Sequence, residues 1–331
     1  MTALTSPRSA LFGVHEAAPA LPVCDHYAGV EPRMTKSLQL QAELGPVFDV
    51  TLDNEDGAPV GAEIDQAQLI AALLGGPDNR YGRVGVRLLT VAHPRFADVA
   101  STVLGAARRP AYLMLPKPES LAEVQHAVAL VDSLGGGDVP LHVLVETHGA
   151  LREVFAIAAE PRIESISFGL MDFVSAHRGA IPQSAMGMSP DGGQFDHPLV
   201  LRAKLEIAAA CHAHGKTPSH SVVTEFKDSA ALKRAATLAR RRLGYTRMWS
   251  IHPNQIRPIV AAFAPTADEL AQAVDIISAA QAVQWAPIQH QQVLHDRASY
   301  RYFWQLIESA QRAAVAGGPA LPAALQAAWF G

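Results

Sequence analysis

Eight short segments rich in apolar and β-branched residues alternate with longer helical patterns, and this alternation restricts the possible folds more than any other feature. The predicted strands lie at 10–14, 47–53, 83–89, 111–116, 141–146, 165–169, 218–223 and 247–253. The predicted helices lie at 33–44, 62–74, 94–108, 118–134, 149–159, 197–214 and 227–243. Because alternating β and α elements form parallel sheets, eight such strands predict an α/β protein with a closed (β/α)8 TIM barrel.

The other α/β architecture, an open doubly wound sheet that binds a dinucleotide, finds no support in the motifs. No GxGxxG follows the first predicted strand, although that fold uses those glycines to cradle a pyrophosphate. Beyond the eighth strand, Thr266 and Glu269 form a capping box for a further helix. We therefore predict a barrel over residues 1–264, which carries the functional site, and a C-terminal helical extension over 265–331.

Composition narrows the class of protein and the kind of partner. The 331 residues are 49% hydrophobic, and the formal net charge is −4 with no long basic run, which argues against nucleic acid as a partner. Cys24 and Cys211 lie far apart and do not suggest a disulfide framework. No apolar run is long enough to span a bilayer or to form the core of a signal peptide. We expect a cytoplasmic protein with a small-molecule substrate and no nucleic-acid or membrane partner.

Polar side chains follow most of the predicted strands, at the end of the barrel where TIM-barrel enzymes place reactive groups. These residues are Asp53, Glu55, Asp56, Arg87, Lys117, Glu146, Asp172, Ser250 and His252. Together they predict a site at the carboxyl ends of the strands.

Glu146 and Asp172 form the most informative pair, because they end neighbouring strands that pack about 4.8 Å apart. Two carboxylates at this spacing repel each other unless a cation lies between them. Mg²⁺ prefers oxygen ligands and leaves positions for water or substrate, so a 2-hydroxy or 2-oxo acid could bind beside it. The alternatives are that Glu146 caps helix 149–159 and that Asp172 caps the turn that follows it.

Arg87 alternates with Val84 and Val86 in "VGVRL" (84–88). The planar guanidinium of a buried arginine suits a carboxylate or phosphate of a ligand. A structural ion pair with Asp53 or Glu55 is the alternative, and the acids of "DNED" (53–56) can equally form a hydrogen-bond network or cap helix 62–74.

The longest irregular stretch, residues 179–198, follows the sixth predicted strand and is rich in Gly, Pro and Ser. Loops of this length within compact domains often bind ligands or close over a site. We predict that this loop contributes to substrate specificity.

Several motifs, in order along the chain, resemble the citrate lyase β-subunit and malyl-CoA lyase group of the HpcH/HpaI aldolase superfamily. They are "LDNEDGAP" (52–59), "VGVRL" (84–88), "LMLPKPES" (113–120), "LVETHGAL" (144–151), "ISFGLMDF" (166–173), "MWSIHPNQIRPI" (248–259) and "VLHDRASYRYFWQLIESA" (293–310). Each motif is weak alone, but the ordered set covers nearly the whole chain after residue 46.

The resemblance implies a Mg²⁺-dependent carbon–carbon lyase. Such an enzyme cleaves or forms a 3-hydroxyacyl-CoA thioester of citryl-, malyl- or citramalyl-CoA type through an enolate. By this resemblance Glu146 and Asp172 hold the metal and anchor the substrate, and Arg87 polarises the thioester carbonyl. A cation and a guanidinium held in place can stabilise the enolate charge without reorganisation.

The resemblance also assigns Asp53, Glu55 and Asp56 to a supporting acidic shell around the site. It makes Asp296, in the C-terminal segment, the general acid/base that reaches the site of a neighbouring subunit. The C-terminal extension then serves as a lid or in assembly, and we expect a homo-oligomer, a trimer or hexamer.

Three departures from the family pattern bear on the substrate. This chain has "DNED" where the family often has "DLED", and "VRLL" where "VRxN" is common. The N-terminal turn that frames the CoA phosphates in the family is replaced by residues 11–36, where Arg33 and Lys36 are candidate phosphate contacts. Two alternatives follow: a class II-type aldolase that acts on free 2-oxo or hydroxy acids, and a non-catalytic binding homologue.

Overall fold

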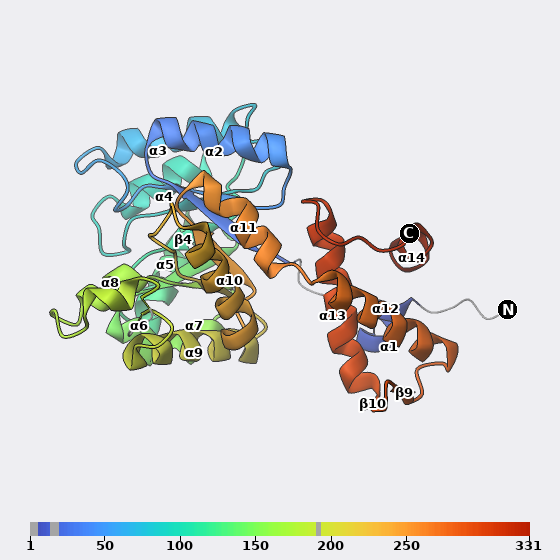
Figure 1. Cartoon of the computed structure of the whole chain (residues 1–331). Helices are drawn as coiled ribbons and strands as arrows, with labels where there is room; N and C mark the ends of the chain where they lie inside the picture. The colour runs from blue at the N-terminus through green and yellow to red at the C-terminus, as the bar shows by residue number, and fades with distance from the viewer. Residues whose placement is uncertain (1–5, 14–19, 190–192) are drawn as a thin grey trace. The chain divides into compact units, whose positions relative to one another are not determined.

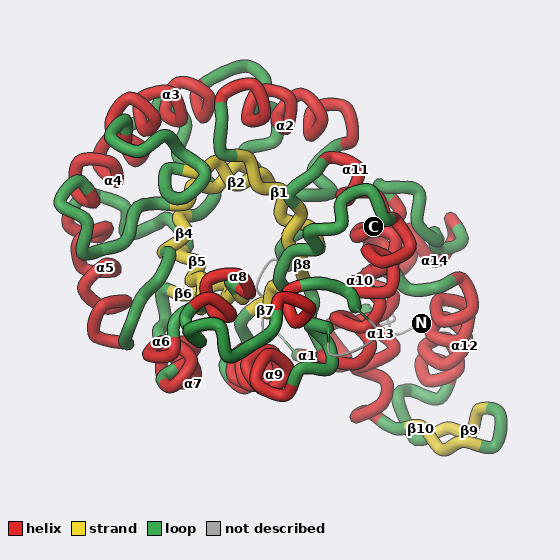
Figure 2. The backbone as a smooth tube through the Cα atoms, turned by 60° about the vertical axis from the view of Figure 1, so that its left-hand side comes forward, coloured by secondary structure: helices red, strands yellow, loops and turns green. Residues whose placement is uncertain are grey.

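Eight parallel strands pair in chain order and close into a barrel, because β1 pairs with both β2 and β8. Helices surround this ring of strands on the outside (Figure 2). The predicted TIM barrel is confirmed. The strands are β1 Cys24–Ala28, β2 Asp49–Asp53, β3 Val84–Arg87, β4 Leu113–Leu115, β5 Leu141–Val145, β6 Ile163–Phe168, β7 Thr217–His220 and β8 Arg247–Ser250.

The computed structural model describes residues 6–13, 20–189 and 193–331, and the chain divides into two compact units (Figure 1). The barrel unit comprises residues 21–259, and the second unit comprises residues 1–20 with 260–331. The helices that follow the barrel strands are α2 Glu31–Leu44, α3 Glu63–Gly75, α4 Phe96–Leu104, α5 Leu121–Ser133, α6 His148–Arg152, α7 Val154–Ala159, α8 Leu170–Ser175, α9 Pro198–Ala213, α10 Ser229–Leu243 and α11 Pro253–Phe263.

The first predicted strand is wrong. Residues 10–12 belong to helix α1 (Pro7–Phe12), where Ser6 caps the N-terminus and Pro7 occupies the first turn. Leu11 is buried in the apolar core of the second unit, so its hydrophobicity serves helix packing and not a sheet. Val14, the last residue of the predicted strand, lies outside the described residues.

The true first strand, Cys24–Ala28, escaped prediction because its sequence "CDHYA" is polar although it is buried. Asp25 Oδ2 lies 3.0 Å from Nη2 of Arg247 on β8, which compensates the buried charge. The other seven predicted strands are confirmed within a few residues at their ends. The predicted helix over 149–159 is two short helices, α6 and α7, separated at Glu153.

The barrel interior is layered from the amino to the carboxyl ends of the strands. The lowest layer is polar: Arg247 binds Asp49 at 2.6 Å, and Thr51 donates to Asp25 at 2.7 Å. An apolar layer follows, made of Tyr112, Met114, Leu144 and Trp249. This layer separates the lower charges from the polar side chains at the carboxyl ends of the strands.

The second unit packs α1 with α12 (Ala267–Ala282), α13 (Arg297–Ala314) and α14 (Ala323–Phe330) around a common apolar core. A two-stranded antiparallel sheet, β9 (Ile288–His290) and β10 (Val293–His295), precedes α13. The capping box of Thr266 and Glu269 is confirmed at the start of α12. Within the described residues, no helix combines the length and apolar character that crossing a membrane requires.

Candidate active site

Glu146 and Asp172 lie at the carboxyl ends of neighbouring strands β5 and β6, as the sequence predicts. Glu146 is 2% exposed, whereas the side chain of Asp172, in the first turn of α8, is 42% exposed. Burial, together with the charge of Asp172, raises the pKa of Glu146 well above its ordinary value. The two acids therefore repel each other electrostatically in a poorly solvated position.

Neither acid serves as the helix cap that the alternative explanation required. Thr147 caps α6 by accepting the Ala150 N–H at 3.0 Å, and Gly169 occupies the N-cap position of α8 without a side-chain bond. Gly169 is required there, because a Cβ atom at this position would lie 2.2 Å from Glu146 Oε2. The glycine of "ISFGLMDF" thus makes room for the Glu146 carboxylate beside the start of α8.

Arg87 lies at the end of β3 and is fixed by an unusually complete set of partners. Its Nε and Nη2 donate to both oxygens of Asp53, at 2.6 and 2.9 Å, and Nη2 also donates to the Tyr27 hydroxyl at 2.9 Å. Nη1 lies 3.1 Å from Glu55 Oε2. The predicted alternative of ion pairs with Asp53 and Glu55 is therefore realised, and these pairs hold the guanidinium in a single orientation.

Asp53 organises the turn that carries the other acids of "DNEDG". Its Oδ1 accepts the Glu55 N–H at 3.0 Å, and its Oδ2 accepts the Gly57 N–H at 2.6 Å as well as the Tyr27 hydroxyl. A Cβ atom on Gly57 would lie 2.5 Å from Asp53 Oδ2, so this turn also requires glycine. These acids form a hydrogen-bond network at the barrel mouth and do not cap α3, whose N-cap is Ala62.

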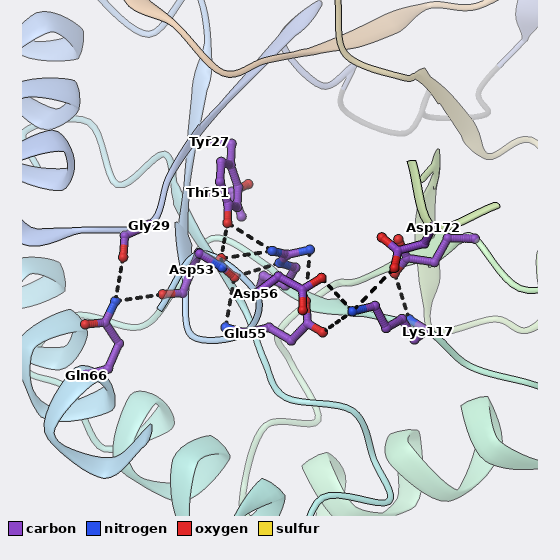
Figure 3. Close-up of polar contacts among 12 residues, drawn as sticks. Tyr27, Gly29, Thr51, Asp53, Glu55, Asp56, Gln66, Lys117 and Asp172 are labelled. Atoms are coloured by element: carbon purple, nitrogen blue, oxygen red, sulfur yellow. Dashed lines mark hydrogen bonds and ion pairs between the residues drawn. The ribbon is translucent and has the colours of Figure 1, made fainter. Parts of the chain in front are cut away.

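Lys117 connects the acids on the two sides of the site (Figure 3). Its ammonium donates to Glu55 Oε1 at 2.6 Å and to Asp56 Oδ2 at 2.5 Å, and it lies 3.7 Å from Asp172 Oδ1. Its backbone N–H donates to Glu146 Oε1 at 3.1 Å. One residue therefore contacts four of the carboxylates at the barrel mouth.

The balance of charge at the barrel mouth favours a divalent cation. Five carboxylates, those of Asp53, Glu55, Asp56, Glu146 and Asp172, face two cations, Arg87 and Lys117. The two cations bind mainly Asp53, Glu55 and Asp56, which leaves the buried Glu146 with a backbone N–H as its partner. Oxygen ligands with excess negative charge suit Mg²⁺, which needs only one or two protein carboxylates.

In the part of the chain that the structure describes, no three His, Cys, Asp or Glu side chains gather in a way that could hold a metal ion. A site formed by Glu146 and Asp172 thus leaves most coordination positions to water and substrate, as Mg²⁺ sites commonly do.

The remaining predicted residues lie outside this cluster. Arg33 and Lys36 are exposed on the first half of α2, which follows the carboxyl end of β1. Asp296 belongs to the second unit and is the N-cap of α13, where its Oδ1 accepts the Ala298 N–H at 2.9 Å. The structure thus gives Asp296 a capping role, and its catalytic role stays a prediction.

The loop predicted at 179–198 borders a cavity of about 730 Å³. The loop contains one turn of 3-10 helix, Gln183–Met186, and residues 190–192 lie outside the described residues. Met171, next to Asp172, lines the cavity together with Met186, Met188, Glu225 and Arg234. A role of this loop in specificity stays a prediction.

Sequence reasoning missed one side chain of the site, Tyr27, and it missed the contacts of another, Lys117. Tyr27 lies on the unpredicted strand β1, and its ring stacks on Trp249 at 6.0 Å between centroids. Lys117 was visible at the end of β4, but its contacts depend on a backbone turn with φ of 49°. The only signal for this turn is the sequence "PKP" (116–118), since prolines restrict the backbone on both sides.

Comparisons with known proteins agree with this fold. The family described as HpcH/HpaI aldolase/citrate lyase matches residues 48–253. A crystal structure of a citrate lyase from Burkholderia xenovorans LB400 is 50% identical, with a TM-score of 0.84, and the match covers 99% of this chain and 100% of that chain. Human mitochondrial citramalyl-CoA lyase is 27% identical over 233 residues, which are 69% of this chain and 67% of that protein.

A further solved structure shares the fold at lower identity. The CitE protein of Mycobacterium tuberculosis, in complex with magnesium, acetoacetate and coenzyme A, is 20% identical with a TM-score of 0.69, and the match covers 89% of this chain and 99% of that chain. The chain therefore belongs to the HpcH/HpaI aldolase/citrate lyase family, a family of carbon–carbon lyases.

Proposed function

We propose that the protein is a Mg²⁺-dependent lyase that cleaves a 3-hydroxyacyl-CoA thioester of citryl-, malyl- or citramalyl-CoA type, or forms it in reverse. The observation that carries the proposal is the arrangement of Glu146 and Asp172 beside a fixed guanidinium, with negative charge in excess. The magnesium in the M. tuberculosis protein and the substrate in the name of the human relative support the same reaction class.

The reaction breaks the bond between the thioester α-carbon and the neighbouring carbinol carbon. The hydroxyl loses its proton and becomes a carbonyl, while the bonding electron pair becomes the enolate of the shorter acyl-CoA. That enolate then takes a proton at carbon to give the acyl-CoA product. Catalysis therefore needs an acceptor for the hydroxyl proton, stabilisation of the enolate oxygen and a donor of the carbon-bound proton.

The barrel mouth offers carboxylates that could accept the hydroxyl proton and cations that could stabilise the enolate oxygen, which serves the first two tasks. Glu146 and Asp172 would hold Mg²⁺, which when bound supplies a Lewis acid for the reacting oxygens. Arg87 would stabilise the enolate, because Asp53 and Tyr27 fix its guanidinium and it need not reorganise during reaction. Glu55 and Asp56 keep Lys117 in place beside this group.

The third task falls to Asp296 in this proposal, and Arg33 and Lys36 would contact the CoA phosphates. Asp296 would exchange the carbon-bound proton in the site of a neighbouring copy, which requires a homo-oligomer. The extension after residue 264 would then close the site against water. Mixed oligomers of Glu146→Gln and Asp296→Asn chains test this arrangement, because activity returns only if one copy completes the site of another.

The deciding experiment is a turnover assay with citryl-, malyl- and citramalyl-CoA and with the corresponding free acids, in Mg²⁺ and in EDTA. We expect cleavage of at least one thioester in Mg²⁺ and its loss in EDTA. Glu146→Gln and Asp172→Asn should each lower kcat/KM by roughly 10³-fold or more, since each removes a ligand of the cation. Cleavage of a free acid alone would instead identify an aldolase that acts without CoA, and binding without any turnover would identify a non-catalytic homologue.

A further inference from the structure

Lys117 occupies a position that the proposed reaction leaves unexplained. The residue lies between two prolines directly after β4, and its φ of 49° is in the left-handed region that residues other than glycine rarely adopt. Such strain persists only where surrounding contacts fix the backbone, and it is frequent at functional sites. Here the strained turn aims the backbone N–H at Glu146 Oε1, at 3.1 Å.

The side chain of Lys117 extends from this turn into the acidic cluster (Figure 3). It is 25% exposed, and its ammonium is held by Glu55 at 2.6 Å and Asp56 at 2.5 Å. A lysine ammonium held by two carboxylates is charged at neutral pH, so Lys117 is a cation of the site.

The same ammonium is the ion-pair partner of Asp172 within the described residues, at 3.7 Å from Oδ1. Arg87, the other cation of the site, pairs instead with Asp53 and Glu55. Lys117 thus partly neutralises a carboxylate that the proposed function assigns to a divalent cation. A positive charge this close to a cation site opposes binding of the cation, and the effect is large because the surroundings are half-buried.

We propose that Lys117 is a positioning residue that sets the metal affinity of the site. Its ammonium holds Glu55, Asp56 and Asp172 in place in the metal-free protein, and its charge weakens Mg²⁺ binding so that the bound cation stays exchangeable. This inference rests on the proposed metal site at Glu146 and Asp172. It adds that a lysine of the same cluster limits the affinity of that site.

Direct titration of metal-free protein with Mg²⁺ by calorimetry, with no substrate present, tests the inference. Lys117→Met removes the charge and keeps much of the side-chain length, and we expect it to bind Mg²⁺ at least about tenfold more tightly than wild type. Lys117→Arg keeps the charge and should stay within about threefold of wild type. Lys216→Met removes a charge just before β7, at the opposite end of the barrel, and should leave the affinity unchanged.

Whether Lys117→Met raises or lowers the Mg²⁺ affinity distinguishes this role from a purely structural one. If Lys117 only supports the fold of the site, Lys117→Met binds Mg²⁺ more weakly or equally, and the inference is overturned while the metal site stands. If wild-type protein binds no Mg²⁺, the proposed metal site fails and the inference fails with it. Thermal unfolding of each variant in EDTA verifies that the compared chains are folded.

Discussion

The two ends of the barrel use the same residue types in opposite ways. At the amino ends of the strands, Arg247 and Arg83 face Asp25 and Asp49, so that two cations balance two acids. Arg247, Asp25 and Asp49 are at most 1% exposed. At the carboxyl ends, five acids face two cations, and Asp172 is partly open to solvent.

This contrast distinguishes a charge network that is balanced within the protein from one that is not. A buried ion pair contributes little net stability, but loss of one partner is costly because the other charge stays buried. A cluster with excess charge of one sign does not reach balance within the protein, so it favours a ligand of the opposite sign.

Arg247→Met should destabilise the protein by about 3–5 kcal/mol, because Asp25 and Asp49 would remain buried without their cation. Urea denaturation, monitored by circular dichroism, measures the loss. Arg152→Met is the matched control: its ion pair with Glu153 is on the surface, where loss of a pair costs about 0–1 kcal/mol. A loss below about 1 kcal/mol for Arg247→Met would show that the lower network is not a closed structural unit.

The wall of the barrel contains a titratable histidine, His26, that hydrogen-bonds a serine instead of an acid. His26 on β1 is 2% exposed, its Nδ1 lies 2.6 Å from Ser250 Oγ, and burial lowers its pKa from 6.5 to about 4. Between these two values the unfolded chain binds more protons than the folded chain, so stability falls as pH decreases from 6.5 to 4. Over this pH range, the shifted pKa of His26 lowers the free energy of unfolding by about 3 kcal/mol.

His26→Gln cannot take up this proton, so the difference in unfolding free energy between wild type and variant should change by about 3 kcal/mol across this pH range. Urea denaturation at a series of pH values measures it. A difference that does not vary with pH would mean that His26 keeps an ordinary pKa in the folded protein.

At the carboxyl ends of the strands, replacing an acid by its neutral amide should stabilise the protein, whereas breaking the Arg247 network destabilises it. Glu146→Gln removes a buried carboxyl group whose ionised form is disfavoured by burial and by Asp172, and it keeps an oxygen for the Lys117 N–H. In EDTA we expect this variant to be more stable than wild type by about 1 kcal/mol. Asp49→Asn, at the lower end, is the matched control and should lose stability. Destabilisation of both variants would remove the distinction between the two ends.

Asp296 caps α13 in the structure and has a proposed catalytic role, and two substitutions separate the two. Asp296→Ala should destabilise α13 by about 1 kcal/mol because the N-cap is lost, whereas Asp296→Asn keeps a capping side chain and should cost far less. Both variants should lower turnover by about 10²-fold or more if the carboxylate transfers the proton. Thermal unfolding and the thioester assay give the two readouts, and an active Asp296→Asn would leave Asp296 with its capping role alone.

The sequence could predict the barrel and the positions of its acids, because strand ends and strand order determine where such residues lie. It could not predict β1, since "CDHYA" becomes a buried strand only through Arg247, which lies on the last strand of the barrel. The apolar segment near Leu11 looked like a strand by composition, but packs as a helix in the second unit. In both cases a distant partner overrides the local pattern.

At the site, too, the local sequence could not predict contacts with distant residues. The positions of Glu146, Asp172 and Arg87 followed from the sequence, but the partners of Arg87 did not, because Tyr27 comes from the unpredicted strand. The contacts of Lys117 depend on a strained turn whose direction no periodic pattern encodes. Residue types at strand ends therefore predict the chemistry of a site better than its geometry.

Calorimetric titration of metal-free protein with Mg²⁺, repeated for Glu146→Gln and Asp172→Asn, examines whether the acids at the barrel mouth hold a cation. We predict that wild type binds one Mg²⁺ per chain and that each variant binds it at least about 100-fold more weakly, while both variants stay folded. Wild-type protein that binds no Mg²⁺, or variants that bind it as tightly as wild type, would contradict the metal site and the lyase mechanism built on it.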